Sequence, residues 1–425
     1  MSCLVCGSSA VTQQLDVGRH PVSSFFLQEK DAPEQKFPLV LGQCETCGTI
    51  QLMQPVPHEA LVPPYDWLFA REPEGHLDTV VSQIVDLPGV TRASVVGALT
   101  SKDDTTVDRF KSLGFNHTWR VELDQDLGVS NPAANIETVQ KLTTPSMMAT
   151  IAARRGPADI LIVRHIMEHA EDLRAFIEGI AALVKPGGIL MVEVPDCSTS
   201  LRLNDYSMIW EEHSLYLTPE TFAPLLEMGG FEAIKTDIYP LPFENSLVQL
   251  ARKTKAPGPT NVHPSARAQV GLLAQYAKNY EPTRRELRAK LERFRAEKGP
   301  IALFGAGHLA CAFVSFMDVA DLIDFVADDT PQKQNKFLPG SRLPIVPSAA
   351  LIDQGIKLCL LALSITNEDA VIGRNSEFTR SGGQFRSIFQ ASSRSIFAGS
   401  ALSSDNCSRD IAMDAFSKNS HGTPR

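Results

Sequence analysis

The sequence lacks any run of about 18 apolar residues, the length that a membrane-spanning helix needs. Its first residues run directly into polar sequence, without the apolar core of a secretion signal. An excess of positive charge is missing too, because 40 Lys and Arg face 49 Asp and Glu and leave a net charge of -9. This balance disfavours the phosphate backbone of nucleic acids as a partner. We therefore expect a cytoplasmic protein that acts on neither membranes nor nucleic acids.

The composition also lacks the marks of disorder, since 43% of the 425 residues are hydrophobic and 21% are charged. At about 150 residues per domain, this length predicts two or three domains. We expect an α/β protein in which a small N-terminal zinc-binding lobe (1–62) precedes a central Rossmann-like sheet (70–254) and a second Rossmann-like α/β domain (265–390). The serine-rich segment 392–425 has no periodicity, and we expect it to be disordered.

Cysteine is scarce but concentrated, because four of the eight cysteines lie in the first 47 residues. They form two CxxC knuckles, Cys3/Cys6 and Cys44/Cys47. Four thiolates saturate a tetrahedral Zn²⁺ ion and leave no position for water, so the pattern predicts a structural zinc site. His20 is a competing ligand that a complete set of four cysteines makes unnecessary. The alternative is that the cysteines only pack against one another.

In the central segment, apolar strands alternate with amphipathic helices, which predicts a parallel sheet. The turn after the first strand is poor in glycine and offers only Gly97. Glu122 lies near the end of the second strand, where an acid can accept hydrogen bonds from ribose hydroxyls, and a later strand delivers Arg164 and His165 at its carboxyl end. These residues allow cofactor binding, but a purely structural sheet remains the alternative.

The loop over residues 205–216 gathers acids, aromatics and a histidine between a strand and a helix. Imidazole titrates near neutral pH, so His213 beside Glu212 suits proton abstraction next to a carbonyl group. His169 has the same chemistry after the strand that ends at residue 163. The plain alternative is a surface histidine among solvated acids.

A second motif lies near the C-terminus, where Gly305, Gly307 and Ala310 form a GxGxxA turn after a strand, with Asp328 or Asp329 about 20 residues on. This is the dinucleotide fingerprint. It supports an NAD(P)-dependent oxidoreductase as a rival function, unless the glycines serve only the turn and packing.

The order of these parts resembles the SAM-dependent sugar C-methyltransferases, which act on nucleotide-linked keto-deoxysugars. The resemblance covers about residues 1–390. It rests on the two cysteine knuckles and on the segments 164–169, 185–188, 193–196, 212–216, 304–307, 324–329 and 337–340.

The resemblance implies a zinc-binding lobe, a central domain that binds S-adenosyl-L-methionine (SAM), and a C-terminal α/β domain. It implies His213, oriented by Glu212, as the catalytic base and His169 as a second active-site histidine. By the same resemblance, the SAM site is bordered by Gly97, Glu122, Arg164 and His165. The acceptor would be a nucleotide-linked keto sugar, methylated at carbon through an enolate.

Two positions depart from the family. Its members commonly have a tyrosine three residues before the catalytic histidine, whereas this chain has Trp210, whose indole cannot act as an acid or base. The turn after the first strand also lacks the usual second glycine. A catalytically silent nucleotide-sugar binding protein is therefore a third hypothesis.

Overall fold

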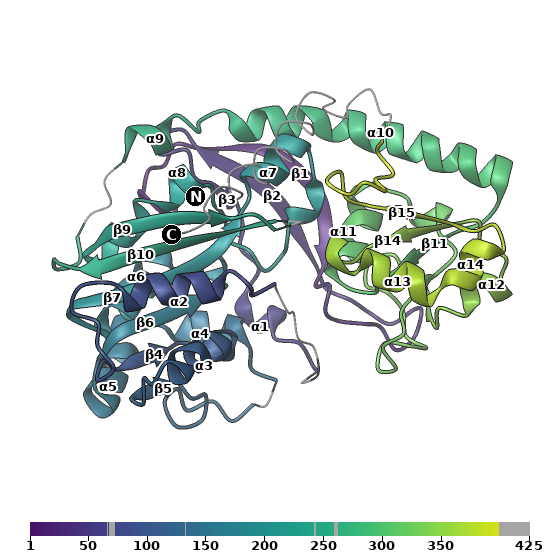
Figure 1. Cartoon of the computed structure of the whole chain (residues 1–425). Coiled ribbons are helices and arrows are strands. Elements are labelled where there is room, and N and C mark those ends of the chain that lie inside the picture. Colours follow the sequence, from purple (N-terminus) through teal and green to yellow (C-terminus); the bar gives the residue numbers. More distant parts are fainter. Residues whose placement is uncertain (66, 68–72, 132, 242–243, 259–261, 399–425) are drawn as a thin grey trace, which may run out of the picture.

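A computed structural model describes residues 1–65, 67, 73–131, 133–241, 244–258 and 262–398. Its strands form three sheets (Figure 1). A central six-stranded sheet and a five-stranded C-terminal sheet lie at opposite ends of the molecule, and a four-stranded N-terminal sheet lies between them. The mixed α/β fold class predicted from the sequence is confirmed.

The central sheet has the order β5-β4-β6-β7-β10-β9. Its first four strands are parallel, and β10 pairs antiparallel with both β7 and β9. The strands are β4 (Val96–Ala98), β5 (Thr118–Arg120), β6 (Ala158–Arg164), β7 (Val184–Asp196), β9 (Phe231–Tyr239) and β10 (Asn245–Lys253). Because β4 pairs with β5 on one side and β6 on the other, the strand order reverses at β4, and ligands of parallel sheets bind at such a reversal.

Helices cover both faces of the central sheet. One face packs against α2 (Leu77–Val85) and α3 (Asp104–Ser112), and the other against α5 (Pro145–Arg155) and α6 (Leu173–Ala182). The shorter helices of this region are α4 (Ile136–Leu142), α7 (Ser198–Leu203) and α8 (Pro219–Phe222). Apolar residues at helical spacing form these buried faces, as in α6, where Leu173, Phe176 and Ile180 are each at most 1% exposed.

The N-terminal sheet has the order β1-β2-β3-β8, built from β1 (Val11–Pro21), β2 (Lys36–Cys44), β3 (Ile50–Leu52) and β8 (Leu215–Tyr216). The short helix α1 (His58–Leu61) follows β3. Strand β8 belongs to the loop that carries His213, and it pairs Ile50 with Tyr216 and Gln51 with Leu215. The chain of the central domain thus completes the sheet of the cysteine segment.

The C-terminal domain is an all-parallel sheet with the order β13-β12-β11-β14-β15. Its strands are β11 (Ile301–Phe304), β12 (Val326–Ala327), β13 (Ile345–Val346), β14 (Leu358–Leu361) and β15 (Gln384–Ser387). Its helices are α11 (His308–Phe316), α12 (Ala350–Asp353), α13 (Glu368–Arg374) and α14 (Ser376–Arg380). The long helix α10 (Leu272–Lys298), preceded by α9 (Pro264–Arg267), runs from the central region to this domain (Figure 1).

One apolar core joins the N-terminal sheet to the C-terminal domain. It contains Leu39 and Leu41 of β2, Tyr276 of α10, and Leu303 of β11 with Phe316 of α11. All five side chains are at most 1% exposed. The N-terminal sheet is thus held by burial of apolar surface against a domain almost 300 residues later in the chain.

The segment after residue 392 differs from the expectation of disorder as far as it is described. Ser395 bridges Ser387 at the end of β15, and Ile396 is 5% exposed in the core. Lys290 of α10 also donates to the Ile396 carbonyl. Residues 399–425, the rest of the expected tail, lie outside the described residues. In the part of the chain that the structure describes, no helix combines the length and apolarity needed to cross a membrane.

Gly179 of α6 gives a test of the packing between helices. A Cβ atom there would lie 2.7 Å from the Thr143 carbonyl oxygen, whereas Gly373 of α13 has nothing within 4 Å. We expect Gly179→Ala to destabilise the protein by roughly 1–3 kcal/mol through overpacking. Gly373→Ala should be neutral or stabilise by up to about 1 kcal/mol. Urea unfolding midpoints measure both, and equal midpoints for the two variants would contradict the packing.

Candidate active site and zinc centre

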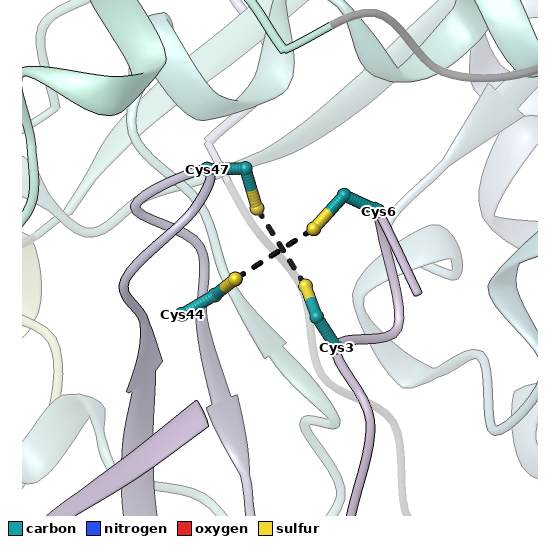
Figure 2. Close-up of side chains that lie close together, drawn as sticks. All are labelled: Cys3, Cys6, Cys44 and Cys47. Carbon is teal, nitrogen blue, oxygen red and sulfur yellow. Dashed lines mark hydrogen bonds between the residues drawn. The ribbon is translucent and has the colours of Figure 1, made fainter. Parts of the chain in front are cut away.

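The two cysteine knuckles converge on one point (Figure 2). The Sγ atoms of Cys3 and Cys47 are 3.6 Å apart, as are those of Cys6 and Cys44, and all four lie within 4.8 Å of one another. With Zn–S bonds of about 2.3 Å, the edge of a tetrahedron of sulfurs is about 3.8 Å. The donor set and its spacing therefore fit a structural Zn²⁺ ion.

Each knuckle is shaped by the glycine that follows it. Gly7 and Gly48 have φ angles of +70° and +74°, and their N–H groups donate to the carbonyls of Cys3 and Cys44. Glycine adopts this backbone region at little cost, so the motif is effectively CxxCG in both copies. His20, the competing ligand, lies elsewhere, with its ring 5.0 Å from that of Phe316.

The glycine-poor turn after β4 is closed by a carboxylate. Asp103 accepts hydrogen bonds from the N–H groups of Leu99 (2.9 Å), Thr100 (2.8 Å) and Arg164 (2.9 Å). Burial raises the pKa of Asp103 to about 7, even though these N–H groups and Arg164 favour its charged form. Gly97 has a packing reason, because a Cβ atom there would lie 2.7 Å from the Trp119 ring.

Arg164 is 1% exposed, and its guanidinium is engaged within the protein. It donates to Glu193 (2.5 Å), to Glu74 (3.1 Å) and to the carbonyl of Lys102 (2.6 Å). This side chain can order the ends of β6 and β7. Most of its N–H donors are already used within the protein, so few remain for a ligand. The expectation that Arg164 borders SAM stays a prediction.

Glu193 of β7 is the acid at the centre of this region, and the sequence analysis gave it no role. His76 Nε2 lies 2.7 Å and His165 Nε2 3.4 Å from Glu193 Oε1. Burial alone would raise the pKa of Glu193, but His165, His76 and Arg164 hold it well below its usual range. Position 165 has a φ angle of 49°, which aims its ring back across the end of β6.

Glu122 lies just after β5. Its carboxylate accepts from Arg120 (3.1 Å), which also pairs with Asp104 at the start of α3 (2.5 Å). The Glu122 side chain is 37% exposed. The structure thus places Gly97 in β4, Arg164 and His165 at the end of β6, and Glu122 just after β5, on three strands that are neighbours in the sheet.

The two candidate histidines meet in a buried cluster. The rings of His169 and His213 lie edge to face with centroids 4.7 Å apart. One ligand atom each of Glu168, His169 and His213 lies within 4.8 Å of the others, and the same holds for Glu137, His169 and Glu212. Glu212 therefore faces His169 and Glu137, and among the described residues no hydrogen bond joins it to His213. The expectation that Glu212 orients His213 is not reproduced.

The two histidines have opposite titration behaviour. Burial, followed by the charge of His169, holds the pKa of His213 well below its usual range. Burial also lowers the pKa of His169, but Glu137, Glu168 and Glu212 outweigh it and leave this pKa raised. Burial and the charges of Glu137 and Glu211 raise the pKa of Glu212 to about 8. The surroundings thus favour the neutral form of His213 and the charged form of His169.

Trp210 links this cluster to the C-terminal domain. Its indole stacks on the ring of His308 with centroids 4.2 Å apart and lies 5.2 Å from the ring of His213. His308 Nε2 is 3.2 Å from the carbonyl oxygen of Ser207. A continuous series of ring contacts therefore runs from one domain to the other, through His169, His213, Trp210 and His308.

Glu211, which the sequence analysis passed over, lies buried where the three parts meet. It accepts from the Ser23 N–H (2.6 Å) and lies 3.5 Å from His308 Nδ1 and 3.9 Å from His20 Nε2. Burial alone would raise the pKa of Glu211, but His308, His20 and the Ser23 N–H lower it to about 2. The carboxylate stays charged and ties the N-terminal sheet to the C-terminal domain.

The dinucleotide fingerprint is satisfied from within the chain. The Ala306 N–H donates to Asp328 Oδ2 (2.8 Å), and Lys333 Nζ donates to the Ala306 carbonyl (2.6 Å). The acid of the motif thus closes its own turn, and His308, at the start of α11, pairs with Glu211. This geometry does not favour the NAD(P)-dependent oxidoreductase, and the glycines serve the turn.

Comparison with known proteins gives matches to three family models. Residues 3–61 match "Putative zinc binding domain", residues 104–236 "Methyltransferase domain" and residues 265–389 "C-methyltransferase C-terminal domain". The C-methyltransferase NovU of Streptomyces niveus is 26% identical over 400 residues, which are 90% of this chain and 94% of that protein. The chain is a SAM-dependent methyltransferase, and its three parts are similar to those of C-methyltransferases. The resemblance drawn from its motifs is confirmed, as are SAM and zinc as its cofactors.

Solved structures align with part of this methyltransferase. A Burkholderia thailandensis 1,6-didemethyltoxoflavin-N1-methyltransferase, bound to S-adenosylhomocysteine, covers 43% of this chain and 80% of its own, with 18% identity and a TM-score of 0.30. The YcgJ protein of Bacillus subtilis covers 43% of this chain and 100% of its own, with 10% identity and a TM-score of 0.28.

The zinc centre predicts the effect of losing one ligand. We expect one zinc ion per chain in the purified protein and less than stoichiometric zinc in Cys44→Ser, together with a lower thermal unfolding temperature, because metal binding contributes to folding. Cys407→Ser, which removes a cysteine far from both knuckles in sequence, is the control and should keep the metal. Elemental analysis and calorimetry measure both quantities, and a metal-free wild-type protein would contradict the assignment.

Glu211 predicts a specific dependence of stability on pH. Its pKa is about 2 in the folded protein against an ordinary 4.5, so its stabilisation is present above about pH 4.5 and lost as the pH falls through 2. We expect Glu211→Gln to lower the free energy of unfolding at pH 7 by about 3 kcal/mol. The difference from wild type should shrink below pH 4.5. Denaturant unfolding at several pH values measures it, and a constant difference would count against the charged carboxylate.

Proposed function

We propose that this methyltransferase methylates carbon in a nucleotide-linked keto-deoxysugar, through an enolate formed by His213. The observation that carries the proposal is the pair of buried histidines with opposite titration behaviour. Groups whose environments push their pKa values apart are suited to act as the base and the acid of one reaction.

The cluster suits a positively charged methyl donor. Glu168 Oε2 is buried and has no hydrogen-bond partner among the described residues. Unpaired buried carboxylate oxygens are costly unless a cation or donor reaches them. When bound, SAM supplies an electrophilic methyl group on a sulfonium ion. We propose that the turn after Gly97, Glu122 and His165 hold it, with Arg164 ordering the ends of β6 and β7.

The proposed reaction divides the proton chemistry between the two histidines. His213 takes the proton from the carbon next to the sugar ketone, and the C–H electron pair becomes the enolate. His169, as an imidazolium, donates a hydrogen bond to the enolate oxygen. The ketone re-forms as this carbon bonds to the methyl group, the sulfur keeps the electron pair of the broken S–C bond, and His213 then releases its proton to solvent. His169 thus offers a titratable donor, which the indole of Trp210 is not.

The acceptor class is tested with dTDP-4-keto-6-deoxyglucose and its 2-deoxy analogue. We expect transfer of the SAM methyl group to sugar carbon, seen as a new C-methyl signal by NMR. Transfer to oxygen, or no transfer to any keto sugar in this series, would contradict the proposal. Binding of these sugars without turnover would instead favour the silent binding protein.

His213→Ala tests the base. Loss of general base catalysis should lower kcat by roughly 10²–10⁴-fold, while SAM affinity stays nearly unchanged. In D₂O with S-adenosylhomocysteine bound, wild type should exchange the acceptor proton next to the ketone, and the variant should not. His117→Ala removes an exposed histidine before β5 and is the matched control. Unchanged turnover in His213→Ala would remove this residue from the mechanism.

A further inference from the structure

We propose that Glu137 is a positioning residue for this reaction and acts through His169. It fixes the orientation of the imidazole and keeps it protonated, so that His169 presents a charged N–H group toward the acceptor. The inference rests on the proposed function only for the role of His169 in catalysis. The contact between Glu137 and His169 stands on its own.

The contact is short and excludes water. Glu137 Oε1 lies 2.5 Å from His169 Nδ1, and the two side chains are 1% and 4% exposed. Hydrogen bonds between an ionised carboxylate and an imidazolium are shorter and stronger than neutral ones. A carboxylate on one ring nitrogen fixes which way the other nitrogen points.

The other face of the imidazole points into the cluster. His169 Nε2 lies 4.0 Å from Glu168 Oε1, and the ring meets the His213 ring edge to face. With Nδ1 held by Glu137, Nε2 is the nitrogen left for the acceptor. Among the described residues, the Glu137 carboxylate makes its side-chain hydrogen bond to His169. We therefore assign Glu137 a positioning role and not a catalytic contact.

Helix α4 offers no separate structural reason for a carboxylate at this position. Asn135 caps the helix by accepting the N–H of Glu137 (3.1 Å). The Glu137 side chain therefore does not cap α4 and instead turns inward. A buried charge of this kind is costly to keep unless its partner is also charged.

The charges around His169 come from three elements. Glu137 faces it from α4, Glu168 from the adjoining turn, and Glu212 with His213 from the loop before β8. His165 acts on Glu168 from 3.8 Å. The charges of Glu137 and Glu168 favour the imidazolium, and Glu137 is the acid in direct contact.

Histidine NMR tests the inference without any acceptor. In ¹³C/¹⁵N-histidine-labelled protein saturated with S-adenosylhomocysteine, the His169 signal is assigned by its loss in His169→Gln. We expect Glu137→Gln to lower the pKa of His169 by roughly 1–3 units, because it removes a charge in contact. Glu137→Asp, which keeps the charge, should give a smaller shift.

Glu227→Gln is the matched control, because it removes the same group from another carboxylate–histidine pair, with His263 at 3.0 Å. It should leave the titration of His169 unchanged. An unchanged His169 titration in Glu137→Gln would overturn the inference. If that variant does not fold, the test moves to the wild-type protein, in which we expect a slowly exchanging Nδ1–H proton signal from His169. Absence of this signal would refute the contact with Glu137.

The reaction gives a second readout. Because His169 acts as the protonated form, the alkaline limb of kcat/KM should move to lower pH in Glu137→Gln by the same shift that NMR records, and partly return in Glu137→Asp. A uniform loss of activity with no shift of the limb would mean a merely structural role and overturn the inference. If wild type turns over no keto sugar, the proposed function fails, while the histidine titration still decides on Glu137.

Discussion

The charged carboxylate of Glu211 is buried between three parts of the chain, and the way these parts pack together depends on it. Glu211 accepts the Ser23 N–H from the N-terminal part and pairs with His308 of the C-terminal domain. It is also next in sequence to Glu212 and His213. A buried charge without its partners is strongly unfavourable, so the three parts stay together or the charge is lost. The position of the loop that carries His213 is thereby tied to the packing of the two flanking domains.

Turns that bind cofactors in other proteins are closed here by the protein's own acids. Asp103 occupies the amides after β4, and Asp328 occupies the amide in the glycine turn after β11. In the C-terminal domain this closure leaves the Rossmann-like sheet as a scaffold. In the central domain, the hydrogen bonds that Asp103 accepts hold a turn with a single glycine in shape. The turn then does not need the backbone freedom that further glycines would give.

Local patterns in the sequence predicted what depends on local chemistry. The spacing of the cysteines indicated one metal site, and the strand ending at Arg164 was predicted within one residue, because both depend on neighbours along the chain. Long-range contacts were not predictable in this way. Glu137 lies 32 residues from His169 on another helix, and no period or spacing connects them. Glu212 was paired with His213 by adjacency, whereas neighbouring side chains in irregular backbone often point to different sides.

Strand β8 connects the zinc centre with the loop that carries His213. Its pairing with β3 attaches the segment just after His213 to a sheet whose own end is fastened by the cysteine knuckles. Metal binding at the knuckles therefore stabilises, through β2 and β3, the same sheet that holds the segment after His213 in place.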